Sequence, residues 1–155
     1  TASQISDGAA ALVVVNAEAL KKYNLKPIAK IVSMALCGCD PVVMLEGPVF
    51  ATKKALKQSG LTIDDMGLYE VNEAFASIPL MWAKALKADP TKLNVNGSGM
   101  SLGHPLGGTG ARIFTSLLGE MKRRQTKFAL VSICEGGGTA NATIIENMQL
   151  PGSKL

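Results

Sequence analysis

The segment FALVSICEGGGTANATII, residues 128–145, decides how this chain folds. It holds two apolar runs, at 128–134 and 140–145, whose length and β-branched residues are typical of strands. The five residues between them include three consecutive glycines, a spacing typical of a hairpin. The segment therefore predicts two antiparallel strands near the end of the chain.

Upstream of this hairpin, apolar runs of strand type alternate with helical patterns. We expect further strands over 9–15, 28–36, 68–71 and 93–96. Apolar stripes, together with Pro at one helix start and Gly at its stop, predict helices over 17–23, 47–58, 75–86 and 111–124. Strands that alternate with helices predict an α/β domain with an antiparallel pair at its end.

Length and composition exclude several classes of protein. A chain of 155 residues that is 47% hydrophobic is long enough to form one domain with a buried core. It contains no run of eighteen apolar residues, so we expect no membrane span. Three cysteines are too few for a disulfide scaffold and favour a reducing compartment. The single histidine excludes a His-rich metal site and any mechanism that needs two histidines.

The net charge of +4 says little about partners. The densest basic cluster, at 122–127, follows an amphipathic stretch, where cations complement the dipole at a helix C-terminus. No aromatic residues alternate with these cations, so we expect no nucleic-acid partner.

The two ends of the chain bear on its compartment. The chain opens on Thr1 without a Met or a leader segment, which favours a fragment or a processed product. The last three residues, Ser153-Lys154-Leu155, match the peroxisomal import signal. Because a tripeptide also arises by coincidence, we expect a cytoplasmic protein, or a peroxisomal one if the tail is a signal.

Asn72 lies where a predicted strand turns into a helix, within the segment Val-Asn-Glu-Ala-Phe of residues 71–75. Its amide can cap the helix that follows, the commoner role of Asn at such a position. It can also face a ligand at the end of the strand. The local pattern leaves both roles open.

His104 lies in a glycine-rich loop, residues 96–110, between a predicted strand and a predicted helix. The place suits a phosphate-binding loop, but the glycine spacing is not the dinucleotide fingerprint. Glycines on both sides of His104 favour instead a main chain that approaches a substrate closely. A helix N-terminus disfavours imidazolium, so we expect a neutral imidazole that donates a hydrogen bond to a developing oxyanion. A histidine bonded only within its loop is the alternative.

Cys134 ends an apolar strand and precedes Glu135 and three glycines. A cysteine in a buried strand is usually only a small hydrophobic side chain. Glycines here, however, weaken a strand and are tolerated where a ligand or another main chain comes close. Main-chain N–H groups in such a turn can bind an anion or an oxyanion.

Cys37 and Cys39 form a Cys-x-Cys pair. With Cys134 and His104 they would nominally complete a zinc site of three thiolates and one imidazole. The pair alone is weak evidence, and the other two residues have a more coherent role. We therefore expect no bound metal.

Together these segments resemble the thiolase family, the acyl-CoA C-acyltransferases. The resemblance covers the chain to about residue 148 and rests on motifs in family order. These are a Ser-containing segment at 1–11, Gly47-Pro48, Asn72-Glu73-Ala74-Phe75-Ala76, Gly103-His104-Pro105 with Gly107 and Gly110, and Cys134-x-Gly136-Gly137-Gly138. The resemblance implies a thiolase-like layered fold, with a five-stranded mixed β-sheet and helices on both faces.

The resemblance also implies roles for individual residues. Cys134 would take a proton from the α-carbon of an acetyl thioester and return one to a leaving thiolate. His104 would donate to the thioester oxygen in one oxyanion hole, which a water held by Asn72 completes. The main-chain N–H of Gly136 would contribute to a second hole. No cofactor beyond CoA thioesters is implied, and the pantetheine arm of CoA would lie along Ser3, Ala74 and Phe75.

The family organisation divides the chain into three parts. Residues 1–26 would be the last strand and linker of the N-terminal thiolase half, 27–148 the C-terminal thiolase domain, and 149–155 a tail. The cysteine that becomes acylated would come from the N-terminal half, in the same gene or as a separate chain. We therefore expect this chain alone to be inactive. The implied function is acyl transfer between CoA thioesters in fatty acid metabolism, by condensation or thiolytic cleavage, in a homo-oligomer.

Two other functions compete with this one. A β-ketoacyl synthase is a related condensing enzyme, but types with two histidines are excluded and Gly103-His104-Pro105 favours a thiolase. A non-catalytic thiolase-fold module for structure or dimerisation is a different class of function.

Within the thiolase interpretation, a Glu135 carboxylate that faces Cys134 would raise the pKa of the thiol, and one turned to solvent would matter little.

Overall fold

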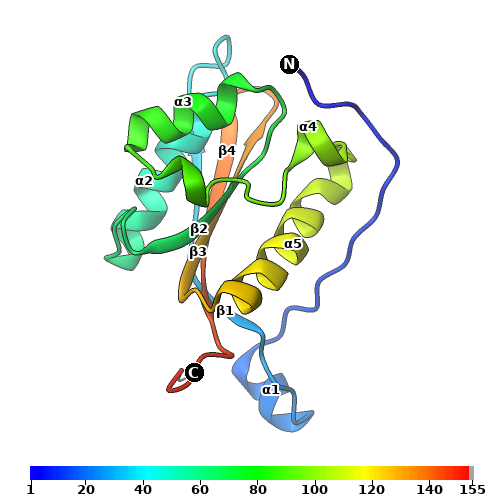
Figure 1. Ribbon diagram of the computed structural model, residues 1–155, viewed down its shortest axis with the longest axis vertical. Coiled ribbons are helices and arrows are strands. Elements are labelled where there is room, and N and C mark those ends of the chain that lie inside the picture. Colours follow the sequence, from blue (N-terminus) through cyan, green and yellow to red (C-terminus); the bar gives the residue numbers. More distant parts are fainter. Residues whose placement is uncertain (154–155) are drawn as a thin grey trace.

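The computed structural model describes residues 1–153, and its centre is a four-stranded mixed sheet (Figure 1). In these residues the strand order is β1-β4-β3-β2. β2 and β3 run parallel, whereas β4 runs antiparallel to both β3 and β1. The strands span β1 Ala29–Gly38, β2 Met66–Val71, β3 Phe128–Glu135 and β4 Thr139–Asn147.

The hairpin predicted from residues 128–145 is confirmed and provides the two central strands. Its turn depends on two glycines in the left-handed region, Gly137 at φ 80° and Gly138 at φ 83°. The carbonyl of Gly138 accepts a hydrogen bond of 2.7 Å from the N–H of Cys39, just after β1. The turn therefore also holds the end of the edge strand.

Helices cover both faces of the sheet, as predicted (Figure 1). α2 (Gly47–Ser59) and α3 (Ser77–Leu86) pack on one face, and α5 (Thr109–Arg124) packs on the other. α2 begins with Pro48 in its first turn and ends at Gly60, whose φ of 71° closes the helix.

Each face has its own apolar core. On the α2 and α3 face, Trp82 packs against Tyr69 and its indole N–H donates to the Thr52 hydroxyl at 2.9 Å. On the α5 face, Ile113 and Leu117 are fully buried in a cluster that includes Leu68, Val131 and Ile145. Leu68 of β2 therefore faces α5, whereas Tyr69 and Val71 face α2 and α3.

The shorter elements lie in the connections. α1 spans Ala17–Lys22, and a 3₁₀ turn, η1, spans Pro90–Lys92. The glycine-rich loop contains a one-turn helix, α4 (Gly99–Leu102), and a second 3₁₀ turn, η2 (Leu106–Gly108). The import signal considered above lies partly outside the described residues, because Lys154 and Leu155 follow Ser153.

The expectation of five strands is wrong, because residues 93–96 do not form a strand. Leu93 makes a single parallel bridge to Tyr69. The next residue, Asn94, has a φ of 47°, which turns the main chain out of the extended conformation. Its side chain bonds the end of β2, so pairing stops after one bridge.

The strand expected over residues 9–15 is also absent from the part of the chain that the structure describes. This segment is extended but pairs with no strand, and it runs past α5 on the outside of the domain (Figure 1). Val13 and Val14 are 89% and 73% exposed. Strand-like composition gives a propensity, but a strand forms only where a neighbouring edge accepts its hydrogen bonds.

We expect the three glycines of the hairpin turn to differ in their tolerance of Ala. A Cβ at Gly138 would lie 2.7 Å from the Cys39 carbonyl oxygen, in addition to the cost of a positive φ. At Gly137 the φ is positive but no atom lies within 4 Å, and at Gly136 neither problem exists. Urea unfolding should therefore show Gly136→Ala near wild type, Gly137→Ala weaker by about 1 kcal/mol, and Gly138→Ala weaker by about 2–4 kcal/mol.

An equal loss of unfolding free energy in Gly137→Ala and Gly138→Ala would contradict the role of the Cys39 contact.

Candidate functional site

The predicted site residues lie around one end of the sheet. Asn72 directly follows β2, and Cys134 is the next-to-last residue of β3, the parallel neighbour of β2. The N–H of Asn72 donates to the Ser132 carbonyl at 3.0 Å, which continues the pairing of the two strands. The carboxyl ends of these parallel strands therefore bring both residues to one edge, the usual place of ligand sites in α/β sheets.

Asn72 contacts His104. Its amide nitrogen Nδ2 lies 3.4 Å from Nε2 of the imidazole, and Asn72 itself is 1% exposed. The helix that follows begins only at Ser77, with Ala76 at its N-cap. The capping role considered for Asn72 is therefore excluded.

The imidazole of His104 is held from its other side by the first residue of α5. Nδ1 lies 2.6 Å from the hydroxyl oxygen of Thr109, so the ring sits at a helix N-terminus, as predicted. Burial and the Arg112 guanidinium lower the pKa of His104 below its ordinary value, which leaves the ring uncharged at pH 7. The sequence analysis did not identify Thr109. A hydroxyl residue at the start of a helix, five residues after the histidine, is the feature that could have indicated it.

Glu73 ties the end of β2 to the loop that carries His104. One carboxylate oxygen accepts from the Asn94 side chain at 2.9 Å, and the other accepts from the Met100 N–H at 3.0 Å. Asn94 in turn bonds the N–H and the carbonyl of Val71, both at 2.9 Å. These bonds fix the position of the loop against the strand end.

The N-terminal segment also reaches this site. The N–H of Ser3 donates to the Ala74 carbonyl at 3.0 Å, its hydroxyl donates to the Glu73 carbonyl, and Ala2 bridges to Phe75. The main chain of His104 donates to the Gln4 carbonyl at 2.8 Å. The three residues expected along a pantetheine arm, Ser3, Ala74 and Phe75, are thus brought together beside His104.

Cys134 lies at the same end of the sheet, but no hydrogen bond joins it to His104 or Asn72 within residues 1–153. Its thiol is free, and burial, with a smaller effect of Glu135, raises the pKa of Cys134 above its ordinary value. The Glu135 carboxylate is exposed and accepts from Thr139 at 3.1 Å and from Asn141 at 2.7 Å. It therefore engages the turn rather than the thiol, and Gly136 follows it at the surface.

Residues 1–153 hold no group of three His, Cys, Asp or Glu side chains that could bind a metal ion. The thiols of Cys37 and Cys39 instead donate to the carbonyls of Gly47 and Met44, each at 3.2 Å. Over the same residues, none of the helices has the length and apolar character that crossing a bilayer requires.

Glu70 is a buried carboxyl that sequence reasoning missed. It is 3% exposed, and burial raises its pKa to about 8, against an opposing effect of Arg112 and an added effect of Glu73. The feature that could have indicated it is the alternation of side chains along a strand, which puts Glu70 on the same face as Asn72.

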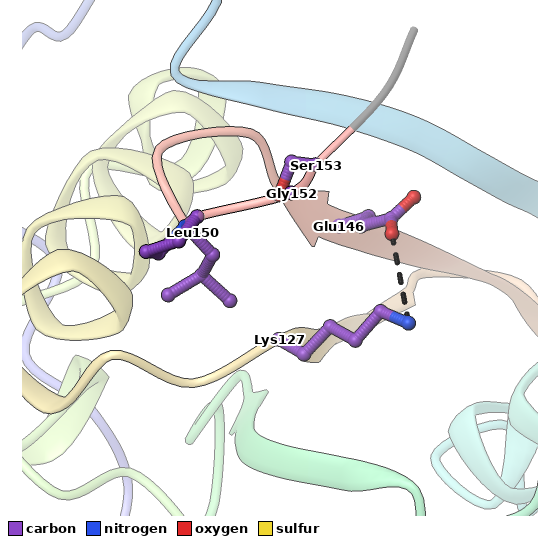
Figure 2. Close-up of a pocket in the computed structure, with 6 residues that line it drawn as sticks. Lys127, Glu146, Leu150, Gly152 and Ser153 are labelled. Carbon is purple, nitrogen blue, oxygen red and sulfur yellow. Dashed lines mark ion pairs between the residues drawn. The ribbon is translucent and has the colours of Figure 1, made fainter.

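A hollow of about 390 Å³ lies far from these residues, at the amino end of β3 (Figure 2). It is lined by Lys127 and Glu146, whose charged groups are 4.0 Å apart, and by residues 150–153. Because it sits at the opposite end of the sheet from Cys134, it takes no part in this site.

Comparisons with known proteins agree on one family. The model of the thiolase C-terminal domain matches residues 25–147. A steroid 3-ketoacyl-CoA thiolase of Mycobacterium tuberculosis is 51% identical over 95% of this chain, and mitochondrial 3-ketoacyl-CoA thiolase of Bos taurus is 51% identical over 94%. The chain spans only 36% and 37% of the length of these two proteins.

Solved structures show the same fold. The acetyl-CoA acetyltransferase of Bacillus anthracis matches 94% of this chain with a TM-score of 0.91 and 45% identity. Human mitochondrial 3-ketoacyl-CoA thiolase in complex with CoA matches 84% with a TM-score of 0.82 and 49% identity. The chain covers 37% and 33% of these two structures.

We expect Glu70 to make the protein less stable as the pH rises. The unfolded carboxyl loses its proton near pH 4.5, but the folded one keeps it to about pH 8. Between these values the folded state binds more protons, so the free energy of unfolding falls with rising pH. Glu70→Gln should remove this slope and exceed wild type at pH 8 by roughly 2–4 kcal/mol, measured by urea unfolding from pH 5 to 8.

Parallel stability curves for Glu70→Gln and wild type over this range would show that Glu70 is ionised in the folded protein.

Proposed function

The chain belongs to the thiolase family, as its C-terminal domain, and from this we propose that it supplies oxyanion-binding and proton-transfer groups to an enzyme that moves acyl groups between CoA thioesters. The contact of Asn72 with His104 at the carboxyl end of β2 is the observation that carries the proposal. The reaction is a Claisen condensation of two thioesters or, in reverse, the thiolytic cleavage of a 3-ketoacyl-CoA.

In this proposal His104 is the main donor to the thioester oxygen. The Thr109 hydroxyl lies 2.6 Å from Nδ1, and in this scheme it donates to that nitrogen while the ring proton is on Nε2. The amide nitrogen Nδ2 of Asn72 lies 3.4 Å from Nε2 of His104. A water held by this amide is then the second donor to the thioester oxygen. Two donors held in place before charge develops stabilise the enolate oxygen more than they stabilise the neutral thioester.

Cys134 carries the proton in this scheme. As a thiolate it takes a proton from the α-carbon of the acetyl thioester, and the resulting enolate charge rests on the oxygen that His104 faces. As a thiol it returns a proton to the CoA thiolate that leaves when an acyl-CoA forms the acyl-enzyme in the condensation direction. The raised pKa of Cys134 means that the thiol predominates at neutral pH, so it can donate a proton without prior protonation. The N–H of Gly136, beside it in the turn, serves the second oxyanion.

The chain needs a partner for the acyl-enzyme step. Because it spans little more than a third of its relatives, we assign residues 1–26 to the end of the N-terminal thiolase half, 27–148 to the C-terminal domain and 149–155 to a tail. The N-terminal half, in the same chain or a separate one, brings the acylated cysteine. CoA lies with its pantetheine arm along Ser3, Ala74 and Phe75, and no other cofactor takes part. The complete enzyme is a homo-oligomer.

We infer a reducing compartment from the cysteines. Cys37, Cys39 and Cys134 are all free thiols, which supports a reducing compartment, cytoplasmic or peroxisomal. Import of a fluorescent reporter that carries residues 146–155 into peroxisomes would select the second; a diffuse cytosolic signal would select the first.

We expect the 155-residue chain alone to remain unacylated. Incubation with acetyl-CoA followed by intact-mass measurement should show the unmodified mass, since the thiols of Cys37 and Cys39 donate to the carbonyls of Gly47 and Met44 and neither is hydrogen-bonded to Asn72 or His104 within residues 1–153. The complete enzyme, with the N-terminal half present, should gain one acetyl group under the same conditions. A stable acetyl adduct on this chain would refute the assignment.

We expect His104→Ala in the complete enzyme to lower kcat for acetoacetyl-CoA thiolysis by about 10²–10³-fold, the value of one oxyanion donor. Gln125→Ala, an exposed change at the far end of α5, is the control and should keep full turnover. Unchanged thiolysis in His104→Ala would favour the structural or dimerisation module instead. The unfolding midpoint of each variant separates loss of chemistry from loss of fold.

A further inference from the structure

The N-terminal segment, residues 1–8, passes beside α4 and contacts both sides of the candidate oxyanion site (Figure 1). The N–H of Ser3 donates to the Ala74 carbonyl at 3.0 Å. The carbonyl of the next residue, Gln4, accepts from the His104 N–H at 2.8 Å. Since consecutive Cα atoms are about 3.8 Å apart, this dipeptide limits how far the main chains at 74 and 104 can separate.

The side-chain contact between Asn72 and His104 is too long to fix their separation by itself. The two nitrogens are 3.4 Å apart, which is more than the length of about 2.7–3.2 Å that most protein hydrogen bonds have. The dipeptide of Ser3 and Gln4, in contrast, ties the main chain of His104 to the segment that directly follows Asn72. The relative position of the two donors therefore depends on this dipeptide.

Gly103, which precedes His104, allows the N-terminal segment to lie directly on the glycine-rich loop. Its φ is 91°, and a Cβ there would lie 2.5 Å from Oγ and 3.0 Å from Cβ of Ser6. Ser6 is half-buried, whereas Gln4 and Ile5 are exposed. Ser6 is therefore the side chain of this stretch that packs against the loop.

Two further glycines make close contacts of the same kind. A Cβ at Gly99 would lie 2.6 Å from Oγ of Ser3, and one at Gly8 would lie 3.0 Å from both Cβ and Cγ of Pro105. The segment thus lies against the loop from Ser3 to Gly8 and not at a single hydrogen bond. At these positions the main chain that approaches the loop closely is the chain's own.

We propose that the N-terminal segment sets the separation between Asn72 and His104, and that Ser6 and Gly103 are the positioning residues that hold this segment on the loop. The Ser6 side chain contacts Gly103 where any other residue would have a Cβ, which keeps the Gln4 carbonyl within reach of the His104 N–H. A reacting or catalytic group displaced by about 1 Å can cost about 10²-fold in rate. The catalytic consequence rests on the proposed function, but the contact between the segment and the loop does not.

Hydrogen exchange of individual main-chain N–H groups, followed by NMR in the 155-residue chain, tests this role. We expect Gly103→Ala to displace Ser6 and to raise the exchange rate of the His104 N–H by about tenfold, because its acceptor moves away. The Met100 N–H, which donates to Glu73 elsewhere in the same loop, should keep its wild-type rate. The double variant Gly103→Ala/Ser6→Gly removes both atoms that the new Cβ meets, so it should restore most of the protection.

Gly107→Ala is the matched control, because this glycine lies in the same loop but a Cβ there would have no atom within 4 Å. Equal exchange of the His104 N–H in Gly103→Ala and Gly107→Ala would overturn the proposal, and so would a double variant that exchanges as fast as Gly103→Ala. If Gly103→Ala loses the native spectrum, Gly8→Ala replaces it, since its Cβ would press on the Pro105 ring without a positive φ. It should raise the same exchange rate by a smaller factor, and an unchanged rate would overturn the proposal.

In the complete enzyme, Gly103→Ala should lower kcat for acetoacetyl-CoA thiolysis by about 10–10²-fold, and adding Ser6→Gly should recover most of this loss. Wild-type kcat in Gly103→Ala, together with fast exchange of the His104 N–H, would overturn the positioning role. Absent turnover in the wild-type complete enzyme would refute the proposed function, while the exchange rates would still decide whether Ser6 and Gly103 hold the segment on the loop.

Discussion

The site depends on the pairing of the Asn94 side chain with the main chain of Val71. Its two hydrogen bonds, both 2.9 Å, occupy the N–H and the carbonyl of the last residue of β2. The N–H of Asn94 also donates to the Tyr69 carbonyl at 2.9 Å. A side chain thus takes the place of a neighbouring strand, and the main chain leaves the sheet at the point where Asn72 begins the site.

The hydrogen bonds of Asn94 also determine the position of the glycine-rich loop that carries His104. Because Asn94 also donates to Glu73, and Glu73 accepts from Met100, one connected set of bonds spans the strand end and α4. α4 is only one turn long, so these bonds rather than helix stability hold it. His104 follows within a few residues, and Gln4 and Thr109 then fix its main chain and its ring.

Two carboxyl groups near the imidazole have opposite surroundings. Glu73 accepts hydrogen bonds from Asn94 and Met100, whereas Glu70 is buried, and burial raises its pKa to about 8. The positive charge of Arg112 adds to burial in lowering the pKa of His104. An uncharged imidazole then follows from burial and charge placement together with the helix dipole.

Sequence patterns predicted the helices and the hairpin well because these features depend on near neighbours. Pro48 and Gly60 delimit α2, and the glycines of 136–138 suit the turn between β3 and β4, through interactions within a few residues. The segments 9–15 and 93–96 have the composition of strands, but whether they pair depends on an edge supplied elsewhere. No edge meets 9–15 within the described residues, and the turn at Asn94 ends pairing after Leu93.

The sequence by itself therefore determined the α/β class, the family, and the candidate residues Asn72, His104 and Cys134, since motif and periodicity are local properties. Only the tertiary structure decided that Asn72 faces His104 instead of capping a helix, that Glu135 turns to Thr139 and Asn141, and that Glu70 is buried. Those outcomes depend on burial and on contacts between residues that are distant in the chain. Neither desolvation nor a missing hydrogen-bond partner is encoded in the pattern of any one segment.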